Sequence, residues 1–152
     1  LFAKNPAWRL KIAGAGVDES RLKKLAGSSP NIEFLGRVSD NEIVKLYQQA
    51  KAYIFPALED FGITPLEAMA CGCPVLAYGV GGATETVVNQ KTGLLFSEQT
   101  SESLKQAIEK SEKMIFKTDD IVNRAKEFSE EKFASRFKNF VENEYNKLIK
   151  SP

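Results

Sequence analysis

Short apolar runs that end at Gly or Pro alternate with segments of helical periodicity, and this alternation constrains the fold more than any other feature. We expect strands in five places: residues 8–16, 31–36, 52–55, 74–78 and 93–96. The segments between them place apolar side chains at helical spacing, as Leu22 and Leu25 do. Parallel strands need a crossover connection, which a helix usually supplies. The sequence therefore predicts an α/β fold, a Rossmann-like parallel sheet with helices on both faces.

Two of the expected helices begin with a capping signal. Ser39 and Glu42 form an S-x-x-E capping box at the start of one helix. Thr64 and Pro65 have the residue types of an N-cap and a first helical position, and Thr64 with Glu67 forms a T-x-x-E box. We therefore expect the second helix to begin at Thr64.

The strand pattern stops near Ser101, and two helical stretches follow. The second carries apolar residues near one face: Phe133, Phe137, Phe140, Val141, Leu148 and Ile149. Its polar side mixes Lys with Glu and has no basic face, so a helical hairpin packed on the sheet is favoured over a membrane-surface helix. Residues 1–152 are expected to form one domain, with the helical tail covering about 101–152.

Composition and charge exclude several classes of function. Lys plus Arg (21) nearly balance Asp plus Glu (20), so the global field favours no nucleic-acid partner. Apolar stretches are too short to cross a bilayer, and we expect no transmembrane segment. Cys71 and Cys73 are the only cysteines and there is no His, so we expect no metal site and no disulfide framework. Two buried thiols in a reducing cytosol are the simpler interpretation.

The segment LEDFGITPLE places acids on both sides of the expected helix start. Glu59 and Asp60 lie in the loop after strand 52–55. An ionised carboxylate only accepts hydrogen bonds, so it matches a ligand rich in hydroxyl donors. Unpaired N–H groups at a helix start bind anions, and Gly62 would let a phosphate approach the backbone. This combination indicates a phosphorylated sugar or nucleotide as ligand.

Three other functions fit parts of the same pattern. GAGVDE begins like the G-x-G-x-x-G of a dinucleotide-binding oxidoreductase, but Glu19 stands where the third glycine should be. A glycoside hydrolase could use Glu59 and Glu67 as acid and base, if the carboxyls faced each other across a glycosidic bond. A non-catalytic module that binds sugar nucleotides would need the same residues without the reaction.

The run PALEDFGITPLEAMACGCPVLAYGVGGATETV resembles the nucleotide-sugar-binding half of retaining glycosyltransferases of family 4. That family has the GT-B fold of two facing Rossmann-like domains. Its E-x7-E signature is present as Glu59 and Glu67, joined to FG, LEAMACGCPV and GG. GLLF and IAGAG fall at the expected distances, so the resemblance covers nearly the whole chain. It implies one half of a GT-B fold with a C-terminal helical extension.

The resemblance implies that Glu59 is the catalytic-site carboxylate, which accepts hydrogen bonds from hydroxyls of the transferred sugar. Glu67 would bind the ribose diol. Amides near the helix start would hold the sugar and the diphosphate, in a donor-binding segment made of Asp60, Phe61, Gly62, Ile63 and Thr64.

Further positions match the nucleotide end of the family site. Arg37 and Val38 follow strand 31–36, where backbone groups meet the base, although an ordinary surface Arg in a turn is as good an interpretation of Arg37. Gly14 and Gly16 match the Gly-x-Gly turn that faces the nucleotide. Gly81 and Gly82 match a Gly-Gly before a helix, in which we expect Glu85 to be structural rather than ligand-binding.

The reaction implied is glycosyl transfer from a nucleotide diphosphate sugar to an acceptor hydroxyl, with retention. EDFGI and AYGVGGATETV look most like mannosyltransferases of polysaccharide or lipopolysaccharide assembly, with GDP-mannose as the first expectation for the donor and a UDP-sugar as the second. No metal and no permanently bound cofactor is implied.

Family members carry an Arg and a Lys on the first strand and helix of this domain, and that motif is not found here. We expect the first strand, both cations and the acceptor-binding domain to lie upstream of Leu1. The missing N-terminal domain is then the main partner, and these residues alone are expected to be inactive. The parent enzyme is expected in the cytoplasm, peripheral on the inner face of the membrane.

Overall fold

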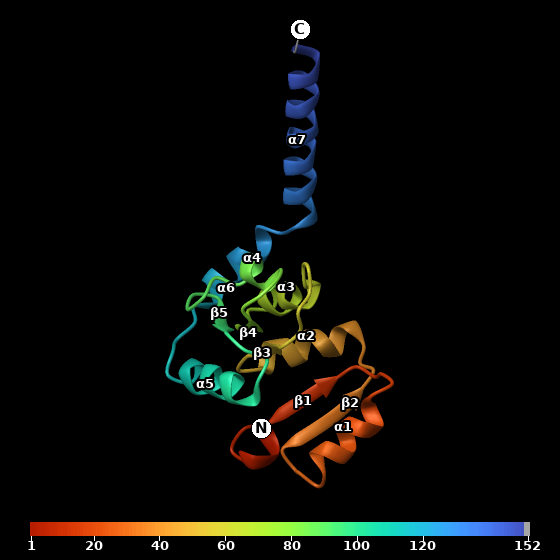
Figure 1. Ribbon diagram of the computed structural model, residues 1–152, viewed down its shortest axis with the longest axis vertical. Coiled ribbons are helices and arrows are strands. Elements are labelled where there is room, and N and C mark those ends of the chain that lie inside the picture. The colour runs from red at the N-terminus through yellow and green to blue at the C-terminus, as the bar shows by residue number, and fades with distance from the viewer. Residues whose placement is uncertain (151–152) are drawn as a thin grey trace.

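Parallel strands alternate with helices in the computed structural model, which describes residues 1–150 (Figure 1). The strands are β1 (Leu10–Ala13), β2 (Ile32–Gly36), β3 (Tyr53–Phe55), β4 (Val75–Tyr78) and β5 (Gly93–Phe96). A short 3-10 helix, Phe2–Lys4, precedes them, and the α-helices are α1 (Glu19–Ala26), α2 (Asp40–Gln49), α3 (Ile63–Ala70), α4 (Ala83–Thr86), α5 (Ser101–Ser111), α6 (Thr118–Lys126) and α7 (Glu130–Lys150). The predicted α/β class and the order of the five strands are confirmed.

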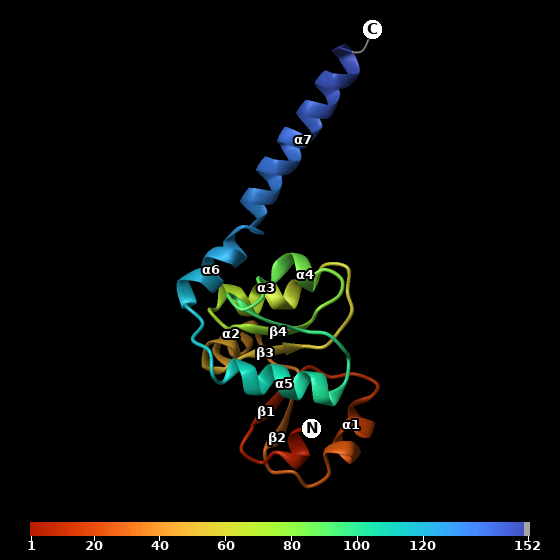
Figure 2. The ribbon, with the colours of Figure 1, turned by 60° about the vertical axis from the view of Figure 1, so that its left-hand side comes forward.

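The strands form two sheets, whereas the sequence predicted one. β1 pairs with β2, and β3, β4 and β5 form a second sheet with β4 in the middle. All pairings are parallel, with Leu10 opposite Ile32 and with Val75 between Tyr53 and Gly93. In both views β1 lies nearer than β2 to the three-stranded sheet (Figures 1 and 2). Among the described strands, β1 pairs only with β2 and β3 pairs only with β4, so backbone pairing does not join the two sheets.

The core lies on both faces of β4. Val75 is fully buried in a cluster with Met69 of α3 and Ile121 of α6. Leu76, the next residue, points to the opposite face and packs near Ile108 of α5. Helices therefore cover both faces of the three-stranded sheet, as predicted. No described residue of β1 or β2 is fully buried, so the smaller sheet is the more weakly packed.

The capping box at the start of α2 is confirmed. The Ser39 hydroxyl accepts a hydrogen bond from the Glu42 amide, and the Glu42 carboxylate accepts one from the Ser39 amide at 2.9 Å. The Ser39 hydroxyl also donates to the Glu42 carboxylate at 2.7 Å, and the bonds from the amide and the hydroxyl of Ser39 to the ionised carboxylate lower the pKa of Glu42.

Helix α7 projects from the body, which corrects the expected helical tail packed on the sheet (Figures 1 and 2). Phe133, Phe137 and Phe140 are between 57% and 66% exposed, and the first two rings stack on each other at 5.8 Å. Helices α5 and α6 do pack on the body. The predicted helical hairpin does not form, because α7 points away from the body and has no surface to pack on. Residues 151–152, the end of the predicted tail, lie outside the described residues. Within the described part, α7 is long enough to cross a membrane but too polar, and every other helix is too short.

Candidate functional site

The loop between β3 and α3 carries Glu59 and Asp60, and backbone contacts with a Gly-Gly turn fix its position. The Gly82 amide donates to the Glu59 carbonyl oxygen at 2.8 Å. A Cβ atom added at Gly81 would lie 2.5 Å from that oxygen, and one at Gly82 would lie 2.4 Å from the Asp60 carbonyl oxygen. Only glycine permits this approach. The side chains of Glu59 and Asp60 stay exposed to solvent.

Helix α3 begins earlier than the sequence predicted. Its N-cap is Gly62, in the left-handed region at φ 77°, and not Thr64. The Thr64 hydroxyl instead accepts a hydrogen bond from the Tyr53 hydroxyl at 3.0 Å, which ties it to β3. Pro65 is tolerated at the third helical position because the N–H it lacks would have no partner within the helix. Glu67 is therefore free of the predicted T-x-x-E capping box, and its side chain is exposed.

Glu59 and Glu67 both act on the Tyr53 hydroxyl. Burial is the main reason that the pKa of Tyr53 is raised, and the negative charges of both glutamates raise it further. The Thr64 hydrogen bond acts in the opposite direction. The charges of both carboxylates thus reach the hydroxyl of Tyr53, a tyrosine that no local pattern marked.

The first turn of α3 presents N–H groups next to these acids. The amides of Gly62, Ile63 and Thr64 donate to no acceptor among the described residues. Such amides, with the positive end of the helix dipole, favour an anion. Two partly exposed apolar side chains, Phe61 and Ile63, flank them. The predicted donor-binding segment is therefore continuous, and all of its residues except the buried Gly62 are exposed.

The other predicted residues lie at the ends of β1 and β2. Gly14 has φ 111°, and its amide donates to the Gly36 carbonyl oxygen at 2.7 Å. Gly16 lies in the open turn before α1, Arg37 is exposed, and Val38 is half-buried. Arg37 makes no ion pair with another described residue.

Two groups of predicted residues result, one on each sheet. The loops that follow β1 and β3 lie on the same side of the molecule, to the right in Figure 2. No described hydrogen bond or ion pair connects the groups. A single ligand could contact both groups of residues only if it spanned the two sheets.

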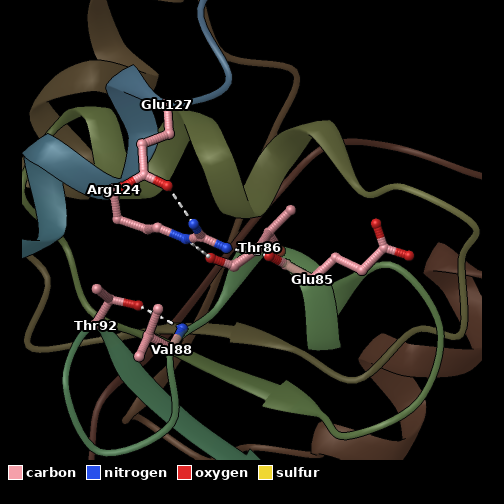
Figure 3. A network of polar contacts seen from close by, with 6 residues as sticks. All are labelled: Glu85, Thr86, Val88, Thr92, Arg124 and Glu127. Atoms are coloured by element: carbon pink, nitrogen blue, oxygen red, sulfur yellow. Dashed lines mark hydrogen bonds and ion pairs between the residues drawn. The ribbon is translucent and has the colours of Figure 1, made fainter.

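Gly81 and Gly82 precede a helix, the four-residue α4, as the resemblance implied. Figure 3 shows the Glu85 side chain directed away from Arg124, while the Glu85 carbonyl oxygen accepts a hydrogen bond from Arg124. Arg124 lies 39 residues further along the chain, and no local pattern marked it.

Burial sets the acidity of the two cysteines. It raises the pKa of Cys73 to about 12 and also raises that of Cys71. Both thiols are free. The described residues contain no group of three or more His, Cys, Asp or Glu placed to hold a metal ion.

Fold and site together define a Rossmann-like α/β domain with its candidate ligand groups beyond the carboxyl ends of its strands. Residues 1–128 match the family model of group 1 glycosyl transferases, and the chain belongs to this family.

Relatives of established name are similar over most of the chain. A GDP-mannose-dependent monoacylated alpha-(1-6)-phosphatidylinositol monomannoside mannosyltransferase from Corynebacterium glutamicum is 37% identical over 134 residues, which cover 82% of this chain and 33% of that protein. The chain spans about a third or less of the length of the first curated relatives it matches.

Solved structures have the same fold. A sucrose-phosphate synthase from Thermosynechococcus elongatus matches with a TM-score of 0.79 at 24% identity, over 95% of this chain and 40% of that one. The Anabaena protein HepE, in complex with UDP and glucose, matches with a TM-score of 0.65 at 26% identity, over 82% of this chain and 37% of that one.

Proposed function

We propose that this chain is the donor-binding half of a glycosyltransferase that moves a sugar from a nucleotide diphosphate sugar to an acceptor hydroxyl with retention. The observation that carries the proposal is that two exposed acids, Glu59 in the loop and Glu67 in the second turn of α3, flank the unpaired amides at the start of this helix. Hydroxyl-accepting acids beside an anion-binding helix start match a ligand that combines sugar with phosphate.

Each group has a distinct part in this proposal. Glu59 accepts hydrogen bonds from hydroxyls of the transferred sugar. The amides of Gly62 and Ile63 hold the diphosphate and stabilise the negative charge that develops as it departs. Glu67 accepts from the ribose diol. No metal ion or resident cofactor has a part in these steps.

The nucleotide end of the donor is assigned to the smaller sheet. The backbone of Arg37 and Val38 meets the base, and the turn at Gly14 and Gly16 faces the nucleotide. A donor bound in this way spans the carboxyl ends of both sheets. The unpaired edges of β1 and β3 support a further parallel strand between them, which an upstream segment would supply.

GDP-mannose is the first candidate donor and a UDP-sugar the second. The mannosyltransferase of C. glutamicum supports the former, and the UDP complex of HepE the latter. The acceptor belongs to polysaccharide or lipopolysaccharide assembly, and the parent enzyme acts in the cytoplasm at the inner face of the membrane.

A second domain supplies the acceptor site in this proposal. The length of the relatives and the exposed apolar face of α7 support such a partner, because a helix with exposed phenylalanines favours a surface to cover them. Residues 1–152 alone would then bind donor weakly and transfer no sugar.

Calorimetry tests the donor site with GDP-mannose, UDP-glucose and NAD. The protein would be compared as the present chain and as a longer form that includes a second domain. We expect the longer form to bind one sugar nucleotide more tightly than the present chain. Binding of NAD, or of no nucleotide by the longer form, would overturn the donor site. Sugar transfer by the present chain would overturn its predicted inactivity.

Substitution of the two acids separates their parts. Glu59→Gln should weaken binding of the sugar nucleotide by about tenfold or more, since it weakens charge-assisted bonds to the sugar, and should leave binding of the free nucleotide unchanged. Glu67→Gln should weaken both. Glu85→Gln is the matched control, because this exposed carboxylate is directed away from the network in Figure 3. Equal effects of all three would contradict the assignment.

A further inference from the structure

Arg124 of α6 binds the C-terminal end of α4 (Figure 3). Its Nε donates to the Thr86 carbonyl oxygen at 3.1 Å, and its Nη2 donates to the Glu85 carbonyl oxygen. The carbonyl oxygens at the C-terminal end of a helix accept no hydrogen bond within it. One guanidinium supplies donors to two of them at once. Glu127 forms an ion pair with the third nitrogen, so the Arg124 side chain is held on several sides.

The opposite end of the same helix holds the loop that carries Glu59. Gly82, the N-cap of α4, donates to the Glu59 carbonyl oxygen, and its Cα lies too close to the Asp60 and Phe61 backbone for any side chain. The fully buried Thr86 joins the two ends, because its hydroxyl donates to the Gly82 carbonyl oxygen at 3.3 Å. One turn of helix therefore connects Arg124 to the loop.

A second connection runs through aromatic rings. The Arg124 guanidinium lies 4.8 Å from the centroid of the Phe128 ring. Phe128 in turn meets the Phe61 ring edge to face, with centroids 6.2 Å apart. Phe61 belongs to the same loop, so Arg124 is linked to that loop by hydrogen bonds on one side and by ring contacts on the other.

We propose that Arg124 and Phe128 are positioning residues, which hold the loop at Glu59–Phe61 in the geometry that the donor requires. The loop has little packing of its own, since Leu58, Glu59, Asp60 and Phe61 are all exposed. A segment with few buried contacts opens readily unless other bonds restrain it. What the loop binds rests on the proposed function, whereas the mechanical link rests only on the contacts described above.

Amide hydrogen exchange of the full chain tests the link without any ligand. In Arg124→Ala, the Gly82 amide, which donates to the Glu59 carbonyl oxygen, should exchange about tenfold faster, as expected when a local restraint is lost, while the β4 amides keep their rates. Arg124→Lys should give an intermediate rate, because one ammonium cannot bond both carbonyls and stack on the ring. Phe128→Leu should also speed exchange of the Gly82 amide, but by less, because it removes the contact with the Phe61 ring and leaves the hydrogen bonds of Arg124 in place.

Two controls separate this role from general effects of lost charge. Arg136→Ala removes an exposed arginine of α7 and should change the exchange rate of neither Gly82 nor β4. Glu127→Gln removes the ion pair but leaves the bonds of Arg124 to both carbonyls, so it should change the exchange rate of the Gly82 amide little.

A donor measurement completes the test. In the longer form with its second domain, Arg124→Ala should weaken sugar-nucleotide binding by about tenfold. Arg136→Ala and Glu127→Gln should bind the sugar nucleotide as tightly as the unsubstituted protein. If the unsubstituted longer form binds no sugar nucleotide, the proposed function fails, and the exchange rates still decide the link. Unchanged exchange at Gly82 in a folded Arg124→Ala, or equal acceleration in β4, would overturn the proposal. If Arg124→Ala does not fold, Arg124→Lys and Phe128→Leu decide in the same way.

Discussion

At the scale of single residues, Gly82 determines where the acidic loop can lie. Its missing side chain lets the backbone of Asp60 and Phe61 approach to distances at which a Cβ would clash, and its amide holds Glu59. The obstructing atoms are backbone, so a side-chain rotation cannot relieve the clash. The loop or α4 would have to move.

We therefore expect Gly82→Ala to destabilise the protein by about 1–3 kcal/mol, the usual cost of overpacking. Denaturant unfolding measures this. Gly16→Ala is the matched control, since a Cβ there meets nothing within 4 Å, and it should change the free energy of unfolding by less than about 0.5 kcal/mol. Similar costs at the two positions would show that the close approach at Gly82 is absent.

A second residue-scale prediction concerns alkaline pH. Burial raises the pKa of Cys73 to about 12 from an ordinary value of 9.0, and raises that of Tyr47 as well. The unfolded thiol then loses its proton at a lower pH than the folded one, so the folded state binds more protons between pH 9 and about 12. The contribution of the protonated Cys73 thiol to the free energy of unfolding should be fully present below pH 9 and should be lost as pH rises through this window.

Denaturant unfolding between about pH 8 and 10.5 checks the slope. Cys73→Ala should be less stable throughout because it leaves a cavity, but its stability should fall less steeply with pH. Parallel curves for the two proteins would rule out a contribution from Cys73.

At the scale of elements, the start of α3 depends on a bond to the neighbouring strand. We expect Tyr53→Phe and Thr64→Val each to cost about 0.5–1.5 kcal/mol, because each removes one partner of the hydroxyl pair. The double variant should cost less than the sum. A double-mutant cycle by chemical unfolding measures the difference. If Thr64 were the N-cap, only its own substitution would destabilise the protein.

The two predicted capping boxes had different outcomes for a physical reason. Ser39 has no competing partner, so its local pattern with Glu42 decided the helix start. The Thr64 hydroxyl has a tertiary partner in Tyr53, and Gly62 can adopt a left-handed backbone, so α3 starts at Gly62. A capping-box sequence thus determines where a helix starts only if no long-range hydrogen bond competes for its side chains.

At the scale of the whole molecule, α7 stands apart from the packed body (Figures 1 and 2). A chain that ends at Ser129 should therefore keep its free energy of unfolding within about 0.5 kcal/mol, since the removed side chains are exposed. It should also bind less of a hydrophobic dye, because the exposed phenylalanines are gone. Thermal unfolding and dye fluorescence measure the two effects. A large loss of stability would mean that α7 packs on the body in solution.

The sequence alone determined the features that depend on near neighbours. The alternation of apolar runs and helical spacing predicted five strands and their order, because a strand or helix pattern repeats within a few residues. The Ser39 box and the acids of LEDFGITPLE were visible for the same reason. The positions of Gly81 and Gly82 before a helix came from the resemblance to a family.

Tertiary structure alone decided how these pieces meet. It split the strands into two sheets, moved the start of α3 to Gly62 and directed α7 away from the sheet. It also brought Arg124 to Thr86 from 38 residues away, and the Tyr53 hydroxyl to that of Thr64. Such contacts join residues far apart in the chain, and their energies depend on the packed geometry rather than on any local pattern.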